Sequence, residues 1–132
     1  EMEKGMIAGS ISPEKAGEAW NRFYEKYLGV VPKNDLEGIL QDIHWTDCFG
    51  YFPTYALGNF YGAMILNRMR EELNPFALVE KGDFGKINEW MAAHVFQEAN
   101  ILEPAAWIKK ITGRELTAED HVAYLQEKYN FE

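Results

Sequence analysis

Helix start and stop signals recur along this chain, whereas signals for strands are weak. Ser12-Pro13 can begin a helix, because serine can cap free N–H groups and proline fits the first helical turn. Apolar residues then recur at helical spacing up to Gly29, which can adopt the left-handed conformation that ends a helix. The sequence therefore predicts an all-α fold.

About six helices are expected from the same kinds of signal. The residues that begin and end them give the segments 13–28, 35–43, 55–73, 83–95, 104–112 and 117–129, with a turn or short helix at 74–82. Segment 55–73 is nearly all apolar, so we expect it to be buried on most of its faces. Gly50 and Pro53 predict an irregular stretch over 46–54.

The chain is 132 residues long, a length that fits one domain. Residues 1–7 look like the last turns of a helix, yet no capping residue precedes them. We therefore expect residues 1–132 to be a single segment of a longer protein.

Charge and composition argue against several classes of partner. The net charge of −8 would repel a phosphate backbone, so nucleic-acid binding is not expected. No apolar run approaches the roughly 18 residues that a membrane span needs. Cys48 is the single cysteine, so no disulfide can form within the chain, and we expect a reducing, cytoplasmic location.

Known metal and nucleophile motifs are absent from the sequence, which contains neither HExxH nor CxxC. His44 and Cys48 lie four residues apart and could share a metal only on a helix, which Gly50 and Pro53 argue against. Two separate side chains are the favoured interpretation, and no metal is expected to bind this chain. A small cysteine enzyme built on Cys48 and His44 ranks last among the functions considered.

Polar and aromatic groups gather between residues 38 and 59, before the long apolar helix. This stretch contains Gln41, Asp42, His44, Trp45, Tyr51 and Tyr55. Loops of this kind often carry binding groups, because a rigid neighbouring element can hold them in place. From the residues alone, a loop that only lines the core, with tyrosine hydroxyls bonded to local backbone, is the slightly favoured interpretation.

Two linked motifs in this stretch resemble the carboxypeptidase Taq family of zinc carboxypeptidases. They are Gly38-Ile-Leu-Gln-Asp-Ile-His-Trp45 and Gly50-Tyr-Phe-Pro-Thr-Tyr55. The resemblance covers the whole chain and aligns it with the C-terminal part of a largely helical metallopeptidase. It implies a cytoplasmic, homodimeric enzyme that releases single residues from the free C-terminus of peptides. The zinc of that family is bound by an HExxH helix and a later glutamate, none of which matches this chain.

The resemblance also suggests roles for individual residues. His44, Tyr51 and Tyr55 match the histidine and tyrosines of the two family motifs. By analogy with related HExxH peptidases, the histidine and one or two of the tyrosines face the zinc, where a tyrosine O–H could stabilise a developing oxyanion. Either tyrosine could take that role, with Tyr51 preferred. Gln41 and Asp42 are expected to orient His44, and Trp45 to pack beside the substrate site. The alternative is a free-standing helical binding module without catalysis.

Overall fold

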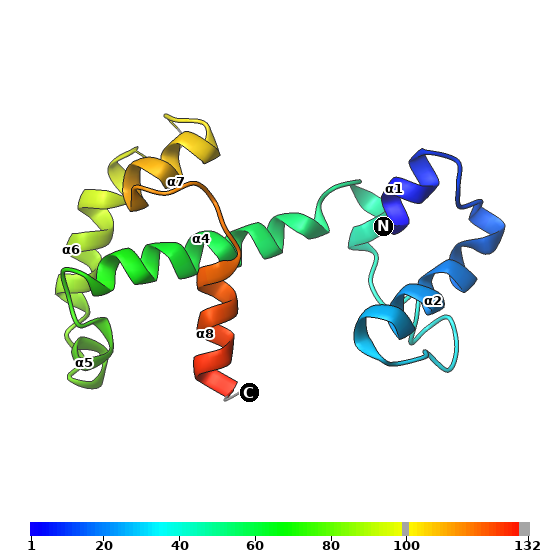
Figure 1. Cartoon of the computed structure of the whole chain (residues 1–132), viewed down its shortest axis with the longest axis horizontal. Coiled ribbons are helices and arrows are strands. Elements are labelled where there is room, and N and C mark those ends of the chain that lie inside the picture. The colour runs from blue at the N-terminus through cyan, green and yellow to red at the C-terminus, as the bar shows by residue number, and fades with distance from the viewer. Residues whose placement is uncertain (99–100, 130–132) are drawn as a thin grey trace. The chain divides into compact units, whose positions relative to one another are not determined.

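The structure is a computed structural model that describes residues 1–98 and 101–129. Within these ranges it contains helices and no strand, which confirms the all-α prediction. Figure 1 traces the elements in chain order. The α-helices are α1 (Met2–Ile7), α2 (Ala16–Leu28), α3 (His44–Asp47), α4 (Phe52–Arg70), α5 (Pro75–Glu80), α6 (Phe84–His94), α7 (Pro104–Thr112) and α8 (Glu119–Tyr129), with 3-10 turns at Pro13–Lys15 and Phe96–Glu98.

The chain divides into two compact units, Glu1–Tyr55 and Ala56–Glu132, called here the N-terminal and the C-terminal unit. In the N-terminal unit, α1 and α2 pack around a small cluster of buried side chains: Met2, Ala16, Ala19 and Trp20. Gly29 ends α2 with φ 68°, in the left-handed conformation predicted for it. The two helices of this unit therefore share one small apolar core.

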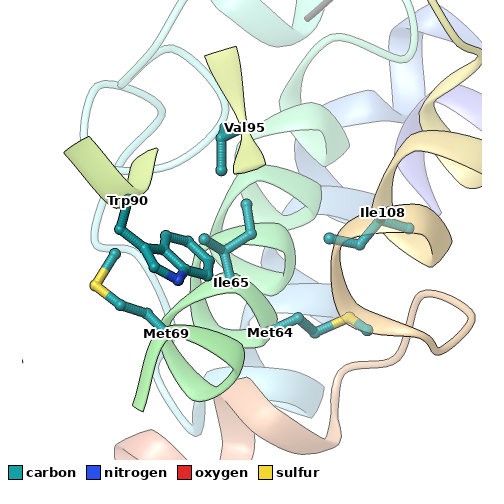
Figure 2. Packing of buried hydrophobic residues seen from close by; sticks show 6 residues of the cluster. All are labelled: Met64, Ile65, Met69, Trp90, Val95 and Ile108. Atoms are coloured by element: carbon teal, nitrogen blue, oxygen red, sulfur yellow. The ribbon is translucent and has the colours of Figure 1, made fainter. Parts of the chain in front are cut away.

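The C-terminal unit has the larger apolar core, shown in Figure 2. Its buried residues are Met64, Ile65, Met69, Trp90, Val95 and Ile108. The indole of Trp90 packs beside Ile65 and Met69, and its N–H donates to Glu72 Oε2 at 2.8 Å. That hydrogen bond is the main cause that lowers the pKa of Glu72. Ile108 and Met64 are the most completely enclosed side chains.

The predicted helix over 35–43 is wrong, because this segment forms successive turns. The Asn34 side chain accepts from the Glu37 N–H at 3.0 Å, and the Leu40 N–H bonds to the Asp35 carbonyl at 2.8 Å. Three of the apolar residues that suggested a helical stripe, Leu36, Leu40 and Ile43, are exposed. With little surface to cover these side chains, local polar hydrogen bonds decide the backbone.

The long helix also departs from its prediction, since α4 begins at Phe52 and ends at Arg70. Its buried residues are confined to the second half, from Ala63 to Met69, whereas Tyr55 and Leu57 are exposed. Burial on most faces is therefore wrong for the first half of α4. Of the irregular stretch predicted over 46–54, only 48–51 lies outside helices, because α3 extends to Asp47 and α4 begins at Phe52.

None of the helices described is long and apolar enough to span a membrane.

Candidate functional site

Asp42 and His44 form a pair in the segment that precedes α4. Asp42 Oδ1 lies 2.6 Å from His44 Nδ1 and also accepts the backbone N–H of His44 at 2.9 Å. The backbone and side-chain hydrogen bonds from His44 hold the pKa of Asp42 below its ordinary value. The ionised carboxylate can only accept, so Nδ1 of His44 carries the proton in this bond.

This pairing leaves Nε2 as the ring nitrogen of His44 that is available to a ligand. In the neutral ring Nε2 accepts a hydrogen bond, and it donates only when the ring is protonated. His44 is about half exposed, with 47% of its side chain accessible, so a ligand can approach it.

Three further rings gather around His44, and we call His44, Tyr51, Phe52 and Tyr55 the aromatic cluster. The His44 ring stacks on Tyr51, with centroids 5.7 Å apart, and on Phe52, with centroids 5.8 Å apart. Tyr55 meets Tyr51 edge to face at 5.5 Å. Aromatic pairs in these geometries stabilise a fold by more than the burial of their apolar area alone would. The structure thus brings together all three candidate catalytic residues, His44, Tyr51 and Tyr55.

The two tyrosine hydroxyls of the cluster are not equivalent. Tyr55 Oη donates to Tyr51 Oη at 3.2 Å. This hydrogen bond to Tyr51 is the main cause that raises the pKa of Tyr55. Because Tyr51 accepts in this bond, its own proton remains available for a ligand.

The remaining residues expected at the site are placed differently. The Gln41 amide donates to the hydroxyl of Tyr24 on α2, whereas Asp42 is hydrogen-bonded to the His44 ring. Gln41 therefore joins the loop to α2 and does not bond to His44 in this structure. The side chain of Trp45 lies outside what the structure describes.

Two features of the site are not indicated by any pattern in the sequence. Glu3 on α1 accepts the backbone N–H of Gly50 at 2.7 Å across 47 positions of sequence. Phe52 stacks on His44 and also borders an open apolar pocket of about 400 Å³. The rest of that pocket is lined by α1, α2 and their neighbours: Glu1, Met2, Glu3, Lys4, Trp20, Phe23, Tyr24, Tyr27, Leu28 and Pro53. Contacts between segments so distant in sequence depend on tertiary packing.

The side chains that the structure describes do not by themselves form a metal site. Among the residues that the structure describes, no group of three His, Cys, Asp or Glu side chains could hold a metal ion. His44 is engaged by Asp42, and Cys48 is exposed, just beyond the end of α3. Structural and catalytic zinc sites need three or four protein ligands, so the pair at Asp42 and His44 is insufficient.

Comparison with known proteins shows similarity along nearly the whole chain. Residues 1–129 match the family model described as carboxypeptidase Taq (M32) metallopeptidase. The chain is 42% identical over 132 residues to carboxypeptidase 1 of Bacillus subtilis, covering 98% of this chain and 26% of that protein. It is 37% identical over 131 residues to thermostable carboxypeptidase 1 of Thermus thermophilus, again covering 98% of this chain and 26% of that one.

The fold agrees with this similarity. The solved structure of metallocarboxypeptidase 1 from Trypanosoma cruzi matches with a TM-score of 0.90 and 33% sequence identity, over 98% of this chain and 27% of that one. The chain thus spans about a quarter of the length of the relatives that it matches. Since the family model covers all but the last three residues, this chain belongs to the carboxypeptidase Taq (M32) family of metallopeptidases.

Proposed function

We propose that this chain forms one wall of the substrate cleft in a metal-dependent carboxypeptidase, which releases residues from the free C-terminus of peptides. The family membership supports the reaction class. The hydrogen bond from Tyr55 to Tyr51 supports the role of the chain, because it leaves the Tyr51 proton free to donate. The metal is bound by residues outside this chain, and the aromatic cluster supplies hydrogen-bond donors.

The chemistry of amide hydrolysis explains why a tyrosine suits this place. When water adds to the peptide carbonyl carbon, negative charge develops on the carbonyl oxygen. A neutral donor that is already in position stabilises this charge more than it stabilises the substrate. A tyrosine O–H, with an ordinary pKa of about 10, keeps its proton at neutral pH.

His44 and Tyr55 have supporting parts in this proposal. Asp42 fixes the His44 ring so that Nε2 is presented to the substrate, where it accepts a hydrogen bond from a peptide N–H or donates one when protonated. Tyr55 orients the Tyr51 hydroxyl by donating to it. The direct donor to the oxyanion is therefore Tyr51.

The finer properties of the whole protein are also proposals. We propose zinc as its metal, a homodimer as its assembly and the cytoplasm as its location. The resemblance to zinc carboxypeptidases supports the first two, and the single cysteine, Cys48, supports the third.

The test is to replace Tyr51 in an active carboxypeptidase that contains this sequence. Tyr51→Phe should lower kcat by about a hundredfold, near the roughly 3 kcal/mol that one oxyanion donor supplies, with KM little changed. Tyr55→Phe should have a smaller effect, because Tyr51 keeps its own proton. Tyr129→Phe, at an exposed tyrosine of α8, is the control and should leave kcat unchanged.

An unchanged kcat in Tyr51→Phe would remove Tyr51 from the donor role. A larger loss in Tyr55→Phe than in Tyr51→Phe would transfer that role to Tyr55. If no protein containing this sequence releases C-terminal residues from peptides, the non-catalytic binding module would replace the carboxypeptidase as the proposed function.

A further inference from the structure

A polar contact joins the loop that carries Tyr51 to α1, the first helix of the chain. Glu3 Oε2 accepts the Gly50 N–H at 2.7 Å, short for an N–H···O bond, as is usual when the acceptor is a carboxylate. Gly50 is the residue immediately before Tyr51. We propose that Glu3 is a positioning residue for Tyr51, which sets where its hydroxyl lies by holding the backbone of Gly50.

The backbone around Tyr51 explains why this contact matters. Gly50 has φ 83°, a left-handed conformation that glycine adopts without strain. The Tyr51 N–H bonds to the Cys48 carbonyl at 3.0 Å, and the Tyr51 carbonyl accepts from the Thr54 N–H at 3.0 Å. These two local bonds fix Tyr51 only relative to its own loop, whereas Glu3 fixes the loop relative to α1.

Glu3 is well placed to act as an anchor. Its neighbour Met2 is buried in the core of the N-terminal unit, and α1 packs against α2. The start of α1 is therefore held by apolar packing. The hydrogen bond from the Gly50 N–H to the Glu3 carboxylate connects the loop to this packed helix. The ring of His44, which is hydrogen-bonded to Asp42, stacks on the tyrosine ring.

This inference rests on the function proposed for Tyr51, but its first test does not depend on catalysis. In the chain of 132 residues, NMR can follow the Gly50 amide proton and the His44 ring protons, whose shifts depend on the stacked Tyr51 ring. Glu3→Ala should move both sets of signals and raise amide exchange at Gly50 by about tenfold or more, since the bond that protects it is lost.

Two further variants separate positioning from general support of the fold. Glu3→Gln keeps a carbonyl oxygen that can accept from Gly50, so its signals should stay close to those of the natural chain. Glu18→Ala removes an exposed carboxylate from α2 and should leave the Gly50 and His44 signals unchanged. If Glu3→Ala lowers stability without moving these signals, the positioning role is overturned.

The second test is kinetic and uses an active carboxypeptidase that contains this sequence. Glu3→Ala should lower kcat by about tenfold with little change in KM, less than the hundredfold that a misplacement of about 1 Å can cost. Glu3→Gln should restore most of the loss. An unchanged kcat in Glu3→Ala beside a large loss in Tyr51→Phe would overturn the positioning role and leave the proposed function standing.

The opposite result is equally distinguishable. If Glu3→Ala moves the Gly50 and His44 signals while Tyr51→Phe leaves kcat unchanged, the attachment of the loop by Glu3 stands. In that case it is the function proposed for Tyr51 that fails.

Discussion

The two units of this chain are stabilised in different ways. In the C-terminal unit, large side chains meet in one cluster, where Met64 and Ile108 are almost completely shielded from solvent. In the N-terminal unit, two of the buried residues are alanines, Ala16 and Ala19, and the loop before α4 depends on hydrogen bonds near the surface. The groups suited to meeting a ligand thus lie in the unit with the smaller core, where polar atoms stay accessible.

Truncating a buried side chain should lower the free energy of unfolding most in the C-terminal unit. Ile108→Ala replaces a fully buried side chain by a cavity and should lower the free energy of unfolding by about 3 kcal/mol, measured by urea titration. Ile101→Ala, at a residue that is 76% exposed in the same unit, should change it by no more than about 0.5 kcal/mol. Equal losses in the two variants would contradict the core assigned here.

The same variant tests how far the units are independent. If stability is local to each unit, the His44 and Tyr51 ring signals of Ile108→Ala should persist at urea concentrations that unfold the C-terminal unit. Loss of both at one midpoint would show that the two units unfold as one.

Enlarging a buried side chain should instead destabilise the N-terminal unit. Ala19 is 3% exposed and lies beside Trp20 in the buried cluster of this unit, so Ala19→Leu should overpack the cluster and lower the free energy of unfolding by about 2 kcal/mol. Ala8→Leu, at the exposed end of α1, is the matched control and should have little effect in a thermal melt. A neutral Ala19→Leu would mean that this cluster is loosely packed.

Acid should have the smallest and most local effect, at the pair of Asp42 and His44. The pKa of Asp42 is lowered in the folded chain, so the ionised carboxylate stabilises the fold at pH values above its ordinary pKa of 3.8. This stabilisation is lost as the pH falls below 3.8. We expect the His44 ring signals to move in this acid range as the bond to Nδ1 is lost. In Asp42→Asn the carboxyl is absent, so that shift of the ring signals should disappear, which NMR can check.

Much of the fold follows from local signals in the sequence. Gly29 and Gly113 end helices in the left-handed conformation, with φ 68° and 74°, and Pro13, Pro75 and Pro104 stand at the starts of their segments. Such signals act within one turn of helix, so they can be recognised without knowing the fold. The error at 35–43 arose because helical spacing indicates a helix only where another surface covers the apolar face, and here Leu36 and Leu40 are exposed.

The site could be predicted in part for the same reason. Asp42, His44, Tyr51 and Tyr55 lie within fourteen positions of sequence, and the structure brings them into one cluster. The contacts of Glu3 with Gly50 and of Tyr24 with Gln41 join distant segments, so no local pattern indicates them. These contacts depend on how α1 and α2 pack in the folded chain.

Cys48 gives the loop an experimental use that follows from its position. It is the single thiol of the chain, it is exposed, and its carbonyl accepts the N–H of Tyr51. A spin label or fluorophore that reacts with thiols will therefore attach at one position only, two residues from Gly50. Changes in the mobility of such a probe would report the movement of this loop when peptides are added, without any substitution in the chain.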